Sequence, residues 1–375
     1  MELLTTDSAR SGFFAGFRPV TPLMEAYQPH DVEAYKRVLA LYERHSLREA
    51  MDSDDLPYIL AGSTDTILRE TYGSVAQPWR DAFKVTSFPN FREQTLADLL
   101  EIETDDQAGN AARNNLIPKV PEGHGYDEAR ISEVIEKATL ATYGITFSYS
   151  RQMLENDDRR AIERIPAALG RTMARTINAK VVEVLEAGAT TSVSGQVMND
   201  TGRLFNDTAV TAAGGHANLV SGSHALAQAT LKAQLVAFGA QKTPSGIKLN
   251  QLGIRAKYLI VPAALELTAR ELVSNAALIG ASGTIVTSEN LLTYLRVVVI
   301  PELTSDVDWY LAADPMDYPT VEVAYLRGNQ NPSLFVQSTD LANLSNADGM
   351  KHKIRHDFVA YAAGWAGMRK IDVTG

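Results

Sequence analysis

An alternating stretch over residues 141–150 leads directly into a long amphipathic one, and this pair constrains the fold more than any other feature. Apolar side chains at Ala141, Tyr143 and every second position after them alternate with small or hydroxyl-bearing ones. This period of two predicts a half-buried strand. Asn156, Asp157 and Asp158 follow, and their side-chain oxygens suit the free N–H groups and positive end of a starting helix.

The predicted helix covers residues 157–187. Apolar residues recur at three- and four-residue intervals from Ile162 to Leu185, and Gly188 marks the end of the pattern. Pro166 has no N–H to donate, so it should kink the helix or delay its regular part until Ala167. Even from that point, about 21 residues at 1.5 Å each give roughly 30 Å. We expect this helix to act as a spine.

Composition limits the classes of protein. The 375 residues are 45% hydrophobic, which favours two or three domains with buried cores. A formal charge of −10 disfavours nucleic-acid binding through bulk electrostatics. The absence of cysteine excludes disulfides, thiolate metal sites and cysteine nucleophiles. Neither a secretory signal nor an apolar run of about 18 residues is present, so we expect a soluble protein of intracellular origin without a membrane segment.

The N-terminal region is predicted to be an irregular arm followed by helices. Phe13, Phe14 and Phe17 stand among glycines and prolines within residues 1–30. Such aromatics indicate either a segment that docks on a partner or a packed tail, and the sequence leaves both open. Residues 31–51 are predicted to be a helix, with a second short one near 64–72.

A long hairpin is predicted over residues 83–149. Two strand-like segments, 83–102 and 131–149, flank a polar and mostly acidic tip at 103–128. A two-stranded ribbon is marginally stable alone, so its apolar face needs a partner surface, and we favour a neighbouring subunit over the chain's own body. The interface candidates are Phe13, Phe14, Phe17, Phe91, Leu96, Tyr143, Ile145, Phe147 and Tyr149.

The remainder predicts an α+β fold without a βαβ period. A polar loop runs to about residue 215, and a helix capped by Ser221 or Ser223 ends at Gly239. A strand at 258–261 and a helix at 262–274 follow. Shorter strands are expected at 295–300, 309–312, 321–326 and 334–337, with a final strand pair at 351–373.

No pattern predicts catalysis, a cofactor or a metal site. His352 and His356 fall on a predicted strand, where they would be about 13 Å apart, too far to share one zinc ion. His216 and His224 stand in a Gly/Ser-rich turn without the context of a nucleophilic serine, so turn and capping roles are expected. No glycine-rich loop matches a nucleotide fingerprint. The residues therefore indicate a scaffold or interaction protein and no enzyme.

Several runs together resemble the major capsid proteins of tailed phages, nearest to the Mu-like major head subunits. The similar segments span roughly residues 72–375 and include 141–148, 151–152, 156–158, 164–170, 174–175, 204–205, 216–219, 258–262, 268–270, 309–314 and 355–358. The chain seems longer than the family pattern between Phe205 and His216, and residues 1–60 match nothing in it.

The resemblance implies a Hong Kong 97-type capsid fold. Residues 1–60 would be an N-terminal arm and helix, and 83–149 the extended loop. Residues 61–82, 150–220 and 346–375 would form a peripheral domain around the spine helix, and 221–345 an axial domain.

The implied function is structural: pentamers and hexamers in an icosahedral shell enclosing phage DNA, within a virion assembled in the bacterial cytoplasm. Portal, scaffold, protease and decoration proteins are the implied partners, without sequence-specific DNA binding. The alternative is an encapsulin-like compartment of the same fold that houses protein cargo.

Overall fold

The computed structural model describes most of the chain from residue 56 onward. The described ranges are 56–98, 102–104, 119–120, 122, 129–131, 134–150, 152, 156, 161–210, 214–244, 246–274, 278–279, 285–286, 292–338 and 349–373. The expected arm, with Phe13, Phe14 and Phe17, and the expected helix over 31–51 lie outside these ranges.

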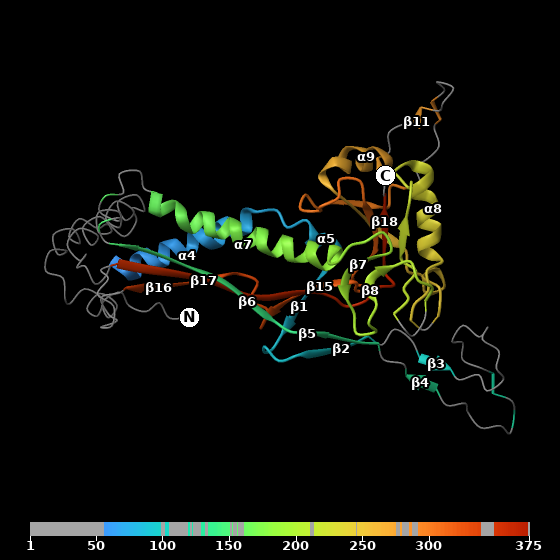
Figure 1. Ribbon diagram of the computed structural model, residues 1–375, viewed down its shortest axis with the longest axis horizontal. Coiled ribbons are helices and arrows are strands. Elements are labelled where there is room, and N and C mark those ends of the chain that lie inside the picture. Colours follow the sequence, from blue (N-terminus) through green and yellow to red (C-terminus); the bar gives the residue numbers. More distant parts are fainter. Residues whose placement is uncertain are drawn as a thin grey trace, which may run out of the picture.

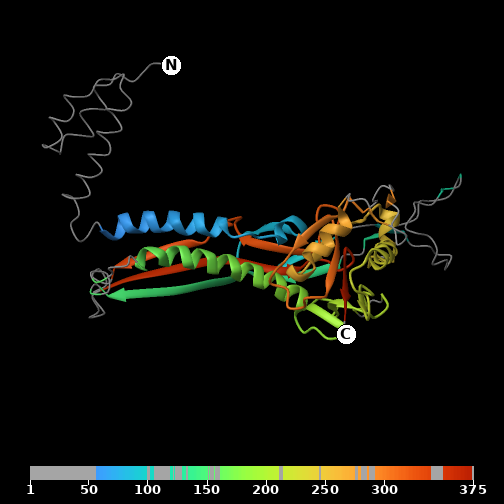
Figure 2. The same cartoon turned by 90° about the horizontal axis from the view of Figure 1, so that it is seen from above.

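Two long helices run side by side along one half of the molecule (Figures 1 and 2). They are α4 (Leu56–Ser74) and α7 (Ala161–Glu186). The 26 residues of α7 span about 39 Å at 1.5 Å per residue, as expected for a spine. The helix continues through Pro166, so the expected delay of its regular part does not occur.

The remaining helices are shorter. They are α5 (Trp79–Ala82), α8 (Gln228–Gly239) and α9 (Glu266–Val273), with 3₁₀ turns at Leu249–Leu252 and Ala263–Leu265. The prediction that Ser221 or Ser223 caps α8 is wrong. Residues 219–221 pair with a distant strand instead, and the helix starts several residues later.

The first sheet lies against α4 and α7. Its strands are β1 (Lys84–Phe88), β6 (Ala141–Ser150), β15 (Val321–Leu326), β16 (Ser333–Ser338) and β17 (Gly349–Ala362). β17 is antiparallel to β15, β16 and β6, and β1 is parallel to β15. On the helix-facing side of β17, Ile354, His356 and Phe358 are buried.

These pairings correct the predicted hairpin over 83–149. β1 does not pair with the returning strand, and β6 leaves the ribbon to pair with β17 along its whole length, from Ala141 opposite Phe358 to Ser150 opposite Gly349. The strand at 141–150 is confirmed, but its partner lies about 200 residues farther along the sequence. β17 has 14 residues and is therefore long enough to form hydrogen bonds along the whole of β6, which a short neighbouring strand could not do.

The second sheet forms the other half of the molecule. Its order is β13 (Arg296–Val299), β10 (Ala256–Val261), β14 (Trp309–Ala313), β18 (Met368–Asp372) and β9 (Leu219–Ser221). All five residues of β14 are buried, as expected for a central strand covered on both faces. Both α8 and α9 contact β10.

Four small ribbons complete the described strands. They are β2 (Gln94–Asp98) with β5 (Val134–Ala138), β3 (Ile102–Thr104) with β4 (Ala129–Ile131), β7 (Val193–Val197) with β8 (Arg203–Asn206), and β11 (Leu278–Ile279) with β12 (Ile285–Val286).

Sheet membership does not follow the expected boundaries at 221–345 and 346–375. β15 and β16 were expected with the axial lobe but pair in the first sheet, while β18 was expected with the peripheral lobe but lies within the second. The chain changes sheets between β14 and β15 and again between β17 and β18. Local patterns predict such strands well, but they do not predict which sheet receives them.

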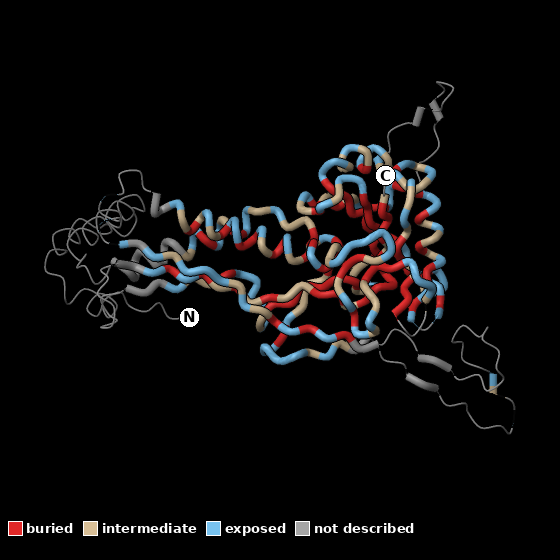
Figure 3. The backbone as a smooth tube through the Cα atoms, in the orientation of Figure 1, coloured by how far each residue is buried: buried red, intermediate tan, exposed pale blue. Residues whose placement is uncertain are grey.

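A continuous hydrophobic core joins the two halves (Figure 3). At the junction, the buried Trp79 indole donates a hydrogen bond to Asn178 Oδ1 on α7 at 3.0 Å. Asn178 Nδ2 donates to Glu302 Oε1 at 2.7 Å. One buried amide therefore links α5, the spine helix and the loop after β13, because a buried polar group must find partners.

Candidate assembly surfaces and the anchor of the extended ribbon

The extended ribbon consists of β2–β5 and, farther out, β3–β4. Figure 1 shows it leaving the body below the second sheet. The inner pair, β2–β5, is the root of the ribbon. In the outer pair Ile102 pairs with Ile131 and Thr104 with Ala129, so strand pairing continues beyond the root. In the described part of the chain, no third strand joins either pair. A two-stranded ribbon of this kind is marginal in water and offers two open edges.

The root of the ribbon packs on the body through a small apolar cluster. Phe88, Ala138, Leu140, Ala324 and Tyr361 are its buried members, and the half-buried Leu96 packs against them. Beside this cluster, a groove of about 500 Å³ lies between β1 and β2. The root is therefore fixed to the subunit's own sheet.

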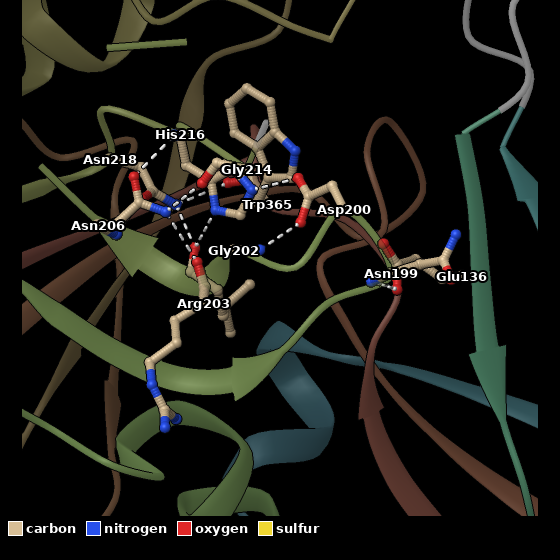
Figure 4. Close-up of polar contacts among 11 residues, drawn as sticks. Glu136, Asn199, Asp200, Gly202, Arg203, Asn206, Gly214, His216, Asn218 and Trp365 are labelled. Atoms are coloured by element: carbon tan, nitrogen blue, oxygen red, sulfur yellow. Dashed lines mark hydrogen bonds and ion pairs between the residues drawn. The ribbon is translucent and has the colours of Figure 1, made fainter. Parts of the chain in front are cut away.

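Glu136 on β5 fixes the root by a polar contact (Figure 4). The residue is 6% exposed, and one carboxylate oxygen accepts a hydrogen bond from the Asn199 backbone N–H at 3.1 Å. Asn199 belongs to the turn between β7 and β8. The contact ties the ribbon to the loop that follows the spine helix.

Burial shifts the ionisation of Glu136. Removal from water raises its pKa to about 7, against the lowering effect of the Asn199 N–H, while nearby Asp200 adds to the rise and His216 opposes it. The carboxyl group at the ribbon's root therefore titrates in the neutral range.

A histidine–aspartate contact lies next to this carboxyl group. His216 Nε2 is 2.8 Å from Asp200 Oδ2, and its Nδ1 is 3.2 Å from the Leu204 carbonyl oxygen. Burial of Asp200 would raise its pKa, but the hydrogen bond and charge of His216 and the Gly202 N–H outweigh burial and lower it. The His216 ring stacks on Trp365 at 4.5 Å, which fixes its orientation.

Two buried asparagines hold the loop that carries this pair. Asn206 Oδ1 accepts from the His216 backbone N–H at 2.8 Å, and Asn218 Oδ1 accepts from the Asn206 N–H at 3.1 Å. Asn218 Nδ2 donates to the carbonyls of Leu204 and Trp365 at 2.7 and 3.2 Å. These bonds give His216 the turn-stabilising role expected from its position.

The predicted interface residues fall into two groups. Phe91, 46% exposed, and Leu96 lie at the root of the ribbon. Tyr143, Ile145 and Phe147 lie on β6: Tyr143 stacks on Phe358 of its own sheet at 4.4 Å, Ile145 is 58% exposed, and Phe147 is half-buried. The side chain of Tyr149 is outside the described residues. Tyr143 thus packs partly within the subunit, and its contact with a neighbour stays a prediction.

The histidines on β17 serve packing. His352 and His356 lie on the strand as predicted, and both are buried. Among the described residues, no cluster of three or more His, Asp or Glu side chains could hold a metal ion. None of the described helices combines the length and apolarity needed to cross a bilayer.

The fold, the protruding ribbon and its open edges define a structural subunit built to contact other chains. Residues 133–371 match the model of the phage capsid protein family, and the chain belongs to that family. It is a major capsid protein with a structural role in the bacteriophage head.

Several solved structures are similar to this chain at low sequence identity. A chain from Mycobacterium phage Adephagia is 12% identical, with 80% of this chain and 91% of that one covered and a TM-score of 0.46. The capsid of an empty GTA particle is 10% identical, with 81% and 92% covered and a TM-score of 0.49. The holo-SrpI encapsulin complex from Synechococcus elongatus is 9% identical, with 80% and 88% covered and a TM-score of 0.46. No curated protein matches the chain.

Proposed function

We propose that the chain assembles with copies of itself into pentamers and hexamers that close an icosahedral shell around phage DNA. The observation that carries this proposal is the extended ribbon, whose outer pair β3–β4 has no third strand beside it among the described residues. A two-stranded ribbon is only marginally stable without a surface to pack on. In a chain of the capsid family, the neighbouring subunit would supply that surface.

Contacts between subunits would be made by three parts of the chain: the ribbon, the outer edge of β6 and the N-terminal arm. The ribbon of one subunit lies over a neighbour, Ile145 and the outer edge of β6 become covered, and the N-terminal arm with Phe13, Phe14 and Phe17 reaches another subunit. A stable interface buries about 1,600 Å² in total, and a shell subunit would form several. The half with α4, α7 and the first sheet would be the peripheral domain of a Hong Kong 97-type fold, and the second sheet the axial domain.

The finer assignments belong to the same proposal. The Mu-like major head subunits are the proposed nearest branch, assembly takes place in the host bacterial cytoplasm, and portal, scaffold, protease and decoration proteins are the proposed partners. The charge of −10 suits a wall that contains DNA without sequence-specific binding.

Shortening the ribbon tests the proposal. Asp98 pairs with Val134, so replacing residues 99–133 by an Asn-Gly turn closes the root with a two-residue hairpin of favoured type. We expect this variant to fold, with the thermal midpoint of the unassembled parent, and to form no shells in electron micrographs. The full chain should form closed shells under the same conditions.

The contents of the shells provide a second readout. DNA protected from nuclease inside shells from infected cells would support the head assignment. A soluble monomer under all conditions, or shells formed equally well by the shortened variant, would refute the proposed role of the ribbon.

A further inference from the structure

A small cavity opens where the first sheet changes partners along β17. Residues 358–362 of β17 pair with β15 and residues 350–355 pair with β16, so His356 and Asp357 face the turn between β15 and β16. The cavity measures about 170 Å³, and its polar lining is contributed by Arg327, Asn329, Asn331, Ser333, Arg355, His356 and Asp357. It is separate from the ribbon and from the Glu136 anchor.

The charged groups of this cavity are mainly cationic. Arg327 and Arg355 line it, against one carboxylate, that of Asp357. Asp357 is already engaged, since Thr142 Oγ1 donates to its Oδ1 at 2.7 Å and Arg355 Nε lies 3.5 Å from its Oδ2. The Arg355 guanidinium also lies 5.1 Å from the centre of the Phe335 ring, which restricts its position.

A buried histidine borders the cavity. His356 is 2% exposed, and its nearest polar group is the Asn329 backbone, which forms no hydrogen bond of standard geometry with either ring nitrogen. Its ring is enclosed by those of Tyr72, Tyr325 and Phe358, with centroids 5.3–5.8 Å away. Burial lowers its pKa to about 4, against the raising effect of the Asn329 backbone and the Asp357 charge, so near pH 7 the ring is neutral.

Two arginines therefore border a space large enough for one small anion and a few waters. Guanidinium groups present a planar set of N–H donors that matches phosphate oxygens, and amide and hydroxyl groups add neutral donors. A liquid water occupies about 30 Å³, so 170 Å³ holds a tetrahedral anion with part of its hydration. We propose that this cavity binds a phosphate group.

The phosphate has two chemical sources, a free ion or a phosphodiester of DNA. Lys351 and Lys353 are exposed on the same face of β17 as Arg355, because alternate residues of a strand share a face. At about 3.4 Å per residue the three cations follow one another every ~7 Å. This row of cations continues from the cavity along β17, although the chain as a whole is acidic. Successive phosphates of a nucleic-acid strand could bind along it.

Calorimetric titration of the purified full-length chain with inorganic phosphate, at constant ionic strength, tests the proposal. We expect saturable binding that Arg355→Gln and Arg327→Asn each weaken at least tenfold. Arg327 has φ +52°, and asparagine tolerates this conformation, so its variant removes the charge without straining the turn. Arg355→Lys should bind with intermediate strength, because it keeps the charge but loses the planar fork.

The matched control is Arg171→Gln, which removes an exposed arginine on α7 far along the chain. It should bind phosphate like the parent, and all variants should keep the parent's far-UV spectrum. Displacement of phosphate by a short DNA oligonucleotide would identify a phosphodiester as the source, and binding of phosphate without such displacement would identify the free ion. Absence of saturable phosphate binding, equal binding of acetate, or parental affinity in a folded Arg327→Asn variant would overturn the proposal.

Discussion

Glu136 is a carboxyl group held out of water at the root of the extended ribbon. Its ionised form loses hydration that the single Asn199 N–H does not fully replace. Because the pKa in the folded chain is about 7 and the ordinary value is 4.5, the folded state binds the proton more tightly than the unfolded chain. Stability from this group is therefore lost as the pH rises from about 4.5 through 7.

Glu136→Gln should remove this loss, since the amide oxygen still accepts from Asn199 and carries no charge. At pH 8 the free energy of unfolding should rise by about 1–2 kcal/mol, a value reduced from the full shift for solvent screening. At pH 4.5 the two proteins should be equally stable. Urea unfolding of the unassembled subunit at both pH values measures this, and a variant less stable at pH 8 would contradict it.

The sequence indicates the burial of Glu136, although no recognised motif includes this residue. Glu136 occupies a position in register with Ala138 and Leu140, both buried, so its side chain shares an inward face. An acid on such a face predicts a partner or a shifted pKa. The identity of the partner, a backbone N–H in the β7–β8 turn, depends on tertiary packing that no local pattern encodes.

At the scale of elements, sequence periodicity predicted whether a segment forms a helix or a strand, but it did not predict which strands pair with each other. The strand at 141–150, the spine helix and the strands at 309–312 and 321–326 are confirmed. The hairpin predicted over 83–149 is confirmed where β2 pairs with β5 and β3 with β4, and it is wrong at its base, because β1 and β6 both pair with strands from the last sixty residues. Alternation selects a face of a strand, whereas the partner is selected by packing across the whole chain.

The contact between α4 and α7 makes a sharp prediction. An added Cβ at Gly170 would lie 2.7 Å from the Leu68 carbonyl oxygen and 3.2 Å from the Tyr72 nitrogen, both backbone atoms of α4. Gly170→Ala should therefore push the helices apart and lower the free energy of unfolding by about 1–3 kcal/mol, as overpacking does. Chemical denaturation of the unassembled subunit is the measurement.

Gly73→Ala is the matched control. Gly73 lies in α4, the other helix of this contact, but an added Cβ there would meet nothing within 4 Å. Alanine should raise the stability by up to about 1 kcal/mol, because glycine loses more backbone entropy in a helix. If both variants were stabilised alike, the close approach of the two helices at Gly170 would not exist.

For the whole molecule, a substitution at the open edge of β6 should distinguish folding of the subunit from assembly of the shell. Ile145 is 58% exposed, and no described strand covers the outer edge of β6. Ile145→Lys should change the subunit's unfolding free energy by less than about 0.5 kcal/mol, as is usual at the surface. A charge on an exposed edge opposes pairing with another chain, so shells should fail to form in electron micrographs.

Ile145→Val keeps an apolar, β-branched side chain at the same position and should assemble like the parent. Normal shells from Ile145→Lys would show that this edge stays open to solvent in the assembly. Unfolding of the lysine variant would show instead that Ile145 supports the subunit itself.

The C-terminal strands have a mechanical consequence. β17 belongs to the first sheet, β18 to the second, and residues 363–367 connect them. An added Cβ at Gly364 or Gly367 would lie within 3 Å of the Tyr318 ring, so this crossing is packed tightly at the junction. A load that pulls the two halves apart would therefore be shared by this peptide, by the second covalent crossing between β14 and β15, and by the core packed between them.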